Sequence, residues 1–192
     1  MRVALTSRSA LVIVDVQRDF MPGGSLPVPK GDSVVGPLND LVRMFEGRRL
    51  PIVLTRDWHP PDHISFRDRG GPWPPHCVAG SEGAEFHPSL AVPPDAIIVS
   101  KATERDREAY SGFEGTDLDS ILRGLGVRRI LVGGVATEYC VKATVLDALK
   151  LGYEVLIVEE AVKGISEEAG DSAKLEMLKE GAILVRLGEI IG

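Results

Sequence analysis

Six short runs of apolar, largely β-branched residues recur along the chain, and each has the length of a β-strand. The first run, residues 9–16, reads Ser-Ala-Leu-Val-Ile-Val-Asp-Val and is apolar almost throughout. Continuous apolar character, without polar alternation, is typical of strands that are buried on both faces of a sheet. The pattern predicts five further strands, at residues 51–55, 95–100, 129–132, 154–158 and 182–185.

Segments with helical periodicity follow the first, third, fourth and fifth of these runs. In residues 34–47, for example, the apolar side chains recur every three or four positions. The pattern predicts further helices at residues 117–125, 137–152 and 166–181. Polar residues that are suited to cap a helix start precede or open these segments: Asp32 or Ser33, Asp117, Thr137, and Ser166 or Glu167.

Strands that alternate with helices form a parallel sheet that helices cover on both faces. The sequence therefore predicts the α/β class, with three layers arranged α/β/α. A length of 192 residues is ordinary for one domain, and the chain shows no repeat, low-complexity tract or linker. We expect residues 1–192 to form a single domain.

Composition narrows the class of protein. The net charge of −6 and the scattered basic residues argue against a nucleic-acid partner. The apolar runs are too short to span a membrane, and the N-terminus lacks an apolar signal core, so we expect a cytoplasmic protein. Two cysteines in such a compartment are expected to be free thiols. The chain has one Asn and one Gln, and this scarcity of thermolabile amides suggests a thermophilic source.

Polar or reactive side chains follow four of the predicted strands at the point where each strand ends. These are Asp15, Asp57, Lys101 and, after the Gly133-Gly134 pair, Cys140. Ligands of open parallel sheets bind at the carboxyl ends of the strands, beside the point where the strand order reverses. We therefore expect the four groups to form one site.

This set of side chains suits acyl transfer. A thiol in the first turn of a helix capped by Thr137 is expected to tend towards the nucleophilic thiolate. Asp15 is suited to move the thiol proton, and Lys101 to stabilise the negative charges. The backbone amides near Ala136 and Cys140 are candidates for an oxyanion hole.

A second group of candidates lies in and before the long Pro- and Gly-rich stretch of residues 60–94. A carboxylate with two or three imidazoles suits Zn²⁺, Fe²⁺ or Mn²⁺. The candidate ligands are Asp57, His59, His63 and His76. His63 could bind the metal directly or through a water molecule. We interpret His87 as a structural or surface residue and Cys77 as a buried apolar residue.

The motifs together resemble those of nicotinamidases and pyrazinamidases of the isochorismatase-like cysteine hydrolase family. The matching stretches cover nearly the whole chain in the family's order: Val12-Ile-Val-Asp-Val-Gln-Arg-Asp-Phe20, Gly23-Gly-Ser-Leu26, Asp57-Trp-His-Pro60, Trp73-Pro-Pro-His-Cys77, Phe86-His-Pro88, Lys101, Tyr110-Ser-Gly-Phe113 and Gly134-Val-Ala-Thr-Glu-Tyr-Cys140.

The resemblance implies a six-stranded, mostly parallel sheet in a Rossmann-like order and a catalytic triad of Asp15, Lys101 and Cys140. It also implies a cis peptide bond between Val135 and Ala136. One divalent metal ion, most simply zinc but also iron or manganese, would bind Asp57, His59 and His76, with His63 joining in some members. The substrate would lie near Phe20, Trp73, Tyr110 and Val135.

The resemblance predicts hydrolysis of nicotinamide, and also of pyrazinamide, through a cysteine thioester, in NAD salvage. One alternative is a related cysteine amidohydrolase that acts on a carbamoyl or ureido substrate, and a more distant one is a vinyl-ether hydrolase of the isochorismatase type. An alternative from a different class is a non-catalytic metal-binding or redox-sensing module that uses Cys77 and Cys140. The sequence leaves a homo-oligomer open.

Overall fold

The computed structural model describes residues 2–191 and has a six-stranded parallel sheet at its centre. Its strands lie in the order β4-β3-β2-β5-β6-β7. Their bounds are β2 (Ser9–Val14), β3 (Ile52–Asp57), β4 (Ile97–Lys101), β5 (Arg129–Val135), β6 (Glu154–Lys163) and β7 (Ile183–Val185). All six predicted strands are present, and the expected Rossmann-like order is confirmed.

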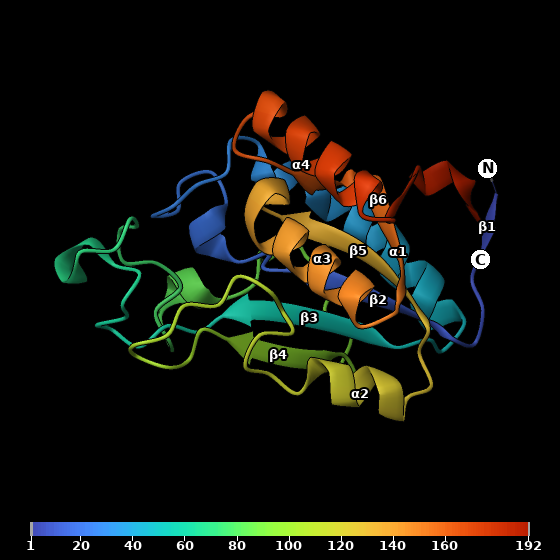
Figure 1. The fold of residues 1–192 in the computed structure, drawn as a ribbon, viewed down its shortest axis with the longest axis horizontal. Coiled ribbons are helices and arrows are strands. Elements are labelled where there is room, and N and C mark those ends of the chain that lie inside the picture. The colour runs from blue at the N-terminus through green and yellow to red at the C-terminus, as the bar shows by residue number, and fades with distance from the viewer. Residues whose placement is uncertain (1, 192) are drawn as a thin grey trace.

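Helices cover both faces of this sheet, which gives three layers (Figure 1). Helix α1 (Val35–Gly47) packs Leu38 and Phe45 against the strand residues Leu11 and Leu54. The opposite face carries α2 (Leu118–Gly124), α3 (Lys142–Lys150) and α4 (Glu167–Lys179). Alternate residues of β2, β3, β5 and β6 enter the two cores, because successive side chains of a strand point to opposite faces. The continuous apolar runs of these strands therefore correspond to burial on both sides, whereas the edge strand β4 leaves Ile98 exposed.

The strands differ from the prediction in number and in length. Strands β1 (Val3–Ala4) and β8 (Ile190–Ile191) form a separate parallel pair and were not predicted, because two residues carry no periodic signal. Strand β5 continues to Val135 because Gly134 still pairs with the neighbouring strand. Strand β6 continues to Lys163, past two glutamates that interrupt its apolar pattern.

The expected helix caps are only partly confirmed. The Ser166 hydroxyl accepts a hydrogen bond from the N–H of Ala169, as a helix cap should. Asp117 and Thr137 make no such bond, and α1 begins at the end of the 3₁₀ helix η2 (Gly31–Val34) without a side-chain cap. Asp117 stands at the N-cap position of α2, as predicted, but without a side-chain bond, whereas the caps predicted at Asp32 or Ser33 and at Thr137 are wrong.

The stretch of residues 60–94 is irregular, as predicted, and contains the 3₁₀ helices η3 (Arg67–Arg69) and η4 (Glu82–Ala84). Further 3₁₀ turns are η1 (Arg18–Phe20) and η6 (Leu187–Glu189). In Figure 1 the long stretch extends from the end of the sheet towards which the β3 and β4 arrows point. It therefore lies at the edge where the candidate site was expected.

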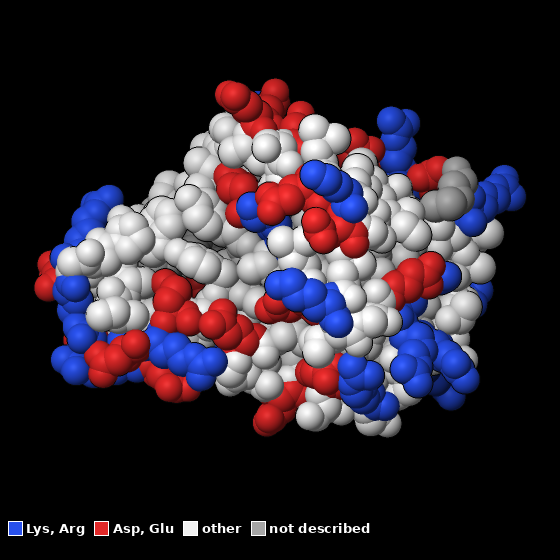
Figure 2. Space-filling view, viewed as in Figure 1, with Lys and Arg blue, Asp and Glu red and all other residues white. Residues whose placement is uncertain are grey.

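Charged side chains of both signs are mixed over most of the face drawn in Figure 2. Ion pairs join some of the exposed charges of the protein, such as Lys142 with Glu176 at 3.0 Å. Within residues 2–191, no helix has the length and apolar character needed to cross a membrane.

Candidate active site

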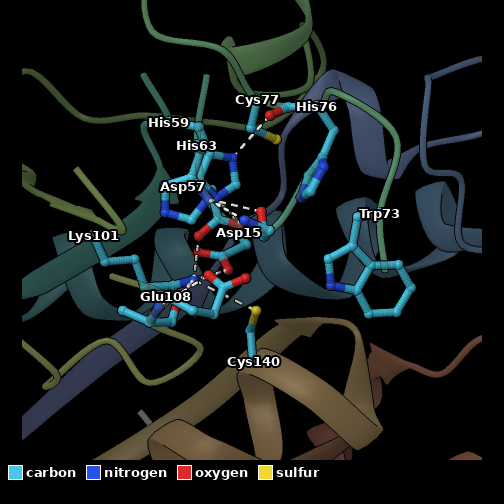
Figure 3. Close-up of polar contacts among 12 residues, drawn as sticks. Asp15, Asp57, His59, His63, Trp73, His76, Cys77, Lys101, Glu108 and Cys140 are labelled. Atoms are coloured by element: carbon cyan, nitrogen blue, oxygen red, sulfur yellow. Dashed lines mark hydrogen bonds and ion pairs between the residues drawn. The ribbon is translucent and has the colours of Figure 1, made fainter. Parts of the chain in front are cut away.

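The strand ends bring four candidate residues together at the carboxyl edge of the sheet. The strand order reverses between β2 and β5, so Asp15 and the Cys140 turn lie on either side of the switch point. Asp57 and Lys101 are the last residues of β3 and β4 and stand in register. One oxygen of Asp15, one of Asp57 and the Cys140 sulfur lie within 4.8 Å of one another. The structure therefore brings all four residues together at this edge of the sheet (Figure 3).

Lys101 lies at the centre of this group. Its Nζ lies 2.9 Å from Asp15 Oδ2, 2.5 Å from Asp57 Oδ1 and 3.5 Å from Cys140 Sγ. It also donates to the carbonyl of Ala109 at 3.3 Å, while the Thr55 hydroxyl donates to Asp15 Oδ1 at 2.7 Å. The side chains of Asp15 and Lys101 are fully buried. Lys101 is thus held by two carboxylates and directed at the thiol.

The backbone at the ends of β2 and β5 is closely packed. A Cβ atom on Gly134 would lie 2.0 Å from the carbonyl oxygen of Val14, and Gly134 has a φ of +125°, so only glycine fits there. The peptide bond between Val135 and Ala136 is cis, as the resemblance implied. Asp15 leaves the strand with a φ of +50°, which ends β2 before the predicted residue 16.

Burial and charge set the protonation of this group together. Burial opposes the charge on Lys101, but its ion pairs with Asp15 and Asp57 outweigh burial and raise its pKa well above the usual value. Burial raises the pKa of Asp15, Lys101 lowers it, and the charge on Asp57 adds to the increase. Lys101 is therefore a permanent cation beside a carboxyl group that takes up a proton readily.

Cys140 lies in a π-helical turn, η5 (Thr137–Val141), directly before α3. Burial raises the pKa of its thiol well above the usual value, and the opposing effect of Lys101 does not compensate. The expectation that the helix start alone favours a thiolate is therefore wrong. One cation already faces two carboxylates, so a thiolate would be a third negative charge. The thiol needs a proton acceptor, and Asp15 is the neighbouring base.

Three of the four predicted metal ligands form a second group beside the first. One donor atom each from Asp57, His59 and His76 lies within 4.8 Å of the others, and all three residues are buried. The Nδ1 atoms of His59 and His76 are hydrogen-bonded to the carbonyls of His76 and Pro74, at 2.8 Å and 2.7 Å. These bonds leave Nε2 of each imidazole to face the centre of the group.

The donor set fits a divalent metal ion. Nε2 of His59 is buried and has no hydrogen-bond partner among the described residues, and it lies 4.0 Å from Asp57 Oδ2. Burial, followed by the neighbouring His76, His63 and Lys101 charges, lowers the pKa of His59 to about 3, although a hydrogen bond to the His76 carbonyl opposes this. The ring is therefore neutral, which is the form that binds metals.

The fourth histidine candidate, His63, is placed differently. Its Nδ1 lies 2.7 Å from the Ser65 hydroxyl and its Nε2 lies 2.9 Å from the carbonyl of Arg107, so both ring nitrogens are engaged. It groups with His59 and Glu108 instead of with Asp57 and His76. His63 therefore supports the loop that follows β4.

Two other residues of the long stretch lie outside the metal group. His87 lines a separate surface hollow together with Arg18, which agrees with a structural or surface role. Cys77 is fully buried in the apolar core, and both cysteines are free thiols, as expected.

Two side chains that the sequence did not identify as functional hold the site in place. Gln17 is fully buried and bonds both the N–H and the C=O of Asp57, each at 2.8 Å, and also the carbonyl of Ala84 at 3.0 Å. Asp19 accepts the N–H of Cys77 at 2.8 Å, directly after the candidate ligand His76. Both residues belong to the motif that follows β2, but only the folded chain shows what they bond.

A cavity opens above the thiol and the metal group. Residues from six segments of the chain line it. They include Cys140, two of the candidate metal ligands and a set of apolar and aromatic side chains: Phe20, Leu26, Val28, Asp57, Trp73, His76, Tyr110, Ala136, Tyr139, Cys140 and Ile165. Three of the four residues predicted to contact the substrate, Phe20, Trp73 and Tyr110, therefore line this cavity. Val135 has a fully buried side chain and does not line the cavity. Leu26, Val28, Tyr139 and Ile165 were not predicted.

The aromatic wall of the cavity is fixed by mutual contacts. Trp73 Nε1 donates to the Tyr110 hydroxyl at 3.0 Å. The ring of Tyr139 stands edge-on to Trp73, with 5.3 Å between the ring centroids, and lies 5.8 Å from the ring of Tyr110. Such aromatic clusters provide a rigid wall for a flat ligand.

Comparison with known proteins places this site in context. The isochorismatase domain matches residues 9–189. The nicotinamidase of Escherichia coli (strain K12) is 38% identical over 94% of this chain and 95% of its own length. The crystal structure of the pyrazinamidase of Pyrococcus horikoshii in complex with zinc has a TM-score of 0.91 and 58% identity, and the match covers 93% of this chain and 99% of that one. PnC1 of L. infantum in complex with nicotinate has a TM-score of 0.93 and 34% identity, over 100% and 99% of the two chains.

Proposed function

The chain belongs to the isochorismatase family, and from this premise we propose that it is a nicotinamidase. It hydrolyses nicotinamide to nicotinate and ammonia, and it also accepts pyrazinamide, the substrate implied by the names of the similar pyrazinamidases. This activity belongs to NAD salvage, and we place it in the cytoplasm.

The observation that carries the proposal is the composition of one cavity. One thiol, one imidazole, one carboxylate and four aromatic rings line the same small space, in which Cys140, His76 and Trp73 are neighbours. A flat ring with a carboxamide substituent matches this lining, because the ring packs against the aromatic side chains while the amide reaches the thiol.

Asp15 and Cys140 perform the first step. The Asp15 carboxylate takes the proton of the thiol, and the sulfur attacks the carboxamide carbon to form a tetrahedral species. Asp15 then gives this proton to the amide nitrogen, the C–N bond breaks, and ammonia leaves a thioester. The raised pKa of Asp15 makes its carboxylate a stronger base towards the thiol. The carboxyl group then keeps the proton until the leaving nitrogen, which is more basic, takes it.

Hydrolysis of the thioester completes the cycle. Asp15 removes a proton from a water molecule, whose oxygen attacks the thioester carbon. The C–S bond breaks, the proton returns to Cys140, and nicotinate is released. Lys101 stabilises the negative charge on Asp15 and on the sulfur throughout, from the distances that the folded chain gives it. We assign the backbone amides of Ala136 and Cys140 to the oxyanion.

Asp57, His59 and His76 would hold one divalent metal ion, for which we favour zinc. The buried Nε2 of His59, for which residues 2–191 supply no hydrogen-bond partner, supports this assignment. When bound, the ion would supply a Lewis-acidic contact for the ring nitrogen of the substrate. Asp57 also bonds Lys101, so the same carboxylate would link the ring-binding and amide-cleaving halves of the site.

The test is release of ammonia by the purified protein from nicotinamide, pyrazinamide and a panel of carbamoyl and ureido compounds. Cys140→Ala is expected to lose turnover by roughly a thousandfold or more. Cys77→Ala is the matched control, because it removes a buried thiol outside the cavity and is expected to retain turnover. Undiminished turnover by Cys140→Ala would contradict the mechanism, and preferential turnover of a ureido compound would contradict the assigned substrate.

A further inference from the structure

Glu138 lies two residues before the candidate nucleophile and has no part in the mechanism above. Its Oε1 accepts a hydrogen bond from the backbone N–H of Ile165 at 2.7 Å. Ile165 lies in the short turn between β6, which ends at Lys163, and α4, which begins at Glu167. The turn that carries Cys140 is thereby bonded to a segment far away in sequence. Turn η5 and helix α4 are in contact, and α3 and α4 begin at the same end of the sheet (Figure 1).

The turn fits closely around this carboxylate. A Cβ atom on Gly164 would lie 2.7 Å from Oε2 of Glu138 and 3.0 Å from the Cα of Gly170. Oε2 itself is buried without a hydrogen-bond partner among the described residues. A buried carboxylate oxygen that makes no bond costs free energy. Glu138 therefore gains only one hydrogen bond, to Ile165, while its other oxygen destabilises the fold. We interpret this side chain as one that positions Ile165, because its net contribution to stability is small.

Ile165 is the residue that this bond places. Its side chain lines the substrate cavity, although 41% of its surface is exposed. It lies in a turn, so neither a helix nor a sheet fixes its position. The part of the cavity lining that Ile165 forms therefore depends on how firmly the turn of residues 164–166 is held.

We propose that Glu138 is a positioning residue that holds Ile165 against the bound ring and so sets the affinity and the size limit of the ring pocket. The proposal rests on the proposed amidase function of the same cavity. Glu138 acts on substrate binding through Ile165, and it does not take part in the chemical step at Cys140.

The kinetic test uses Glu138→Ala, Glu138→Gln, Ile165→Ala and the double variant Glu138→Ala/Ile165→Ala. Glu138→Ala is expected to raise KM for nicotinamide about fivefold, the equivalent of one net hydrogen bond, with kcat changed less than about twofold. Glu138→Gln keeps an acceptor for the Ile165 amide and should restore KM. In the Ile165→Ala background, removing Glu138 should add no further change. A fall in kcat at constant KM, or additive effects in the double variant, would overturn the proposal.

Glu168→Ala is the matched control, because it removes an exposed carboxylate from the start of α4 and should leave KM unchanged. Hydrogen exchange provides a readout that does not depend on turnover. The Ile165 amide should exchange faster in Glu138→Ala than in the wild type. Unchanged protection would show that the Glu138 hydrogen bond does not hold the turn. If the wild-type protein does not hydrolyse nicotinamide, the proposed function fails. The exchange measurement still decides whether Glu138 holds the turn that carries Ile165.

Discussion

Two ion pairs join neighbouring strands of the sheet, one at the carboxyl ends of the strands (the carboxyl edge) and one at their amino ends (the amino edge). They differ in burial and in the groups that surround them. At the carboxyl edge, Asp57 and Lys101 end β3 and β4 in register and are buried. At the amino edge, Arg129 and Glu154 begin β5 and β6 in register, and their side chains are 22% and 45% exposed. Arg129 bonds both oxygens of Glu154, at 2.7 Å and 3.1 Å.

The difference lies in what surrounds each pair. The exposed pair has water as an alternative partner, so its net contribution to stability is small. The buried pair has lost its water, and its cation also serves Asp15 and the thiol. Breaking a buried pair leaves a charge with no partner, which is far costlier than never having formed the pair. The buried pair lies beside the cavity, where the proposed mechanism uses its cation.

The largest effect is expected from Lys101→Met. It leaves Asp15 and Asp57 buried without their cation, and the free energy of unfolding should fall by about 3–5 kcal/mol. Turnover of nicotinamide should be lost as well. Urea unfolding and ammonia release measure the two effects. Loss of activity without loss of stability would show that the buried carboxylates are paired by another group.

The next effect is expected from Gln17→Leu. Leucine fills a similar volume but leaves the N–H and C=O of Asp57 and the C=O of Ala84 without their bonds. Each unsatisfied buried group costs about 1–3 kcal/mol, and the partial relaxation of three should lower stability by roughly 3 kcal/mol. Zinc affinity, measured by competition with a chelating dye, should also fall, because Asp57 is no longer held. Unchanged affinity would contradict this role for Gln17.

A small effect is expected from Arg129→Met, the matched deletion at the amino edge. It removes a cation from an exposed pair, so stability should fall by no more than about 1 kcal/mol and kcat should not change. Urea unfolding beside Lys101→Met provides the comparison. Equal losses in the two variants would show that burial does not distinguish the pairs.

The smallest effect concerns pH at the amino edge. Burial, together with a hydrogen bond of 2.7 Å to Asp119, raises the pKa of Tyr153 to about 12 from an ordinary value of 10.0. The folded chain holds this proton more tightly than the unfolded chain, so its stabilising effect is complete below pH 10 and is lost as pH rises through about 12. Tyr153→Phe should therefore lose stability less steeply than the wild type over this interval, as urea midpoints would measure. Parallel curves would contradict the shifted pKa.

The sequence predicted most of the site because strand ends can be read from the chain. Asp15, Asp57 and Lys101 each follow a continuous apolar run, and parallel strands bring such ends to one edge. The histidines His59 and His76 were recognised by residue type alone. The resemblance, and not the periodicity, separated them from His63 and implied the cis peptide bond that the structure contains.

Other features had no local signal. The thiol pKa of Cys140 depends on burial beneath the cavity and on charges contributed by three other strands. The bonds of Gln17 join residues 40 and 67 positions apart. Tyr139 and Ile165 line the cavity only because β5, β6 and α4 meet beside it.

By itself, the sequence determined the layers of the fold, which polar residue follows each strand, and the residue types that the chemistry requires. Periodicity and residue type are local properties, and hydrophobic burial translates them directly into strands and helices. Only the tertiary structure decided which ring nitrogen of His59 and of His76 is left free, how closely Asp15 and Lys101 approach Cys140, and which turn brings Ile165 to the cavity. These depend on distances of a few ångströms between segments far apart in the chain, and packing sets such distances only when the whole chain has folded.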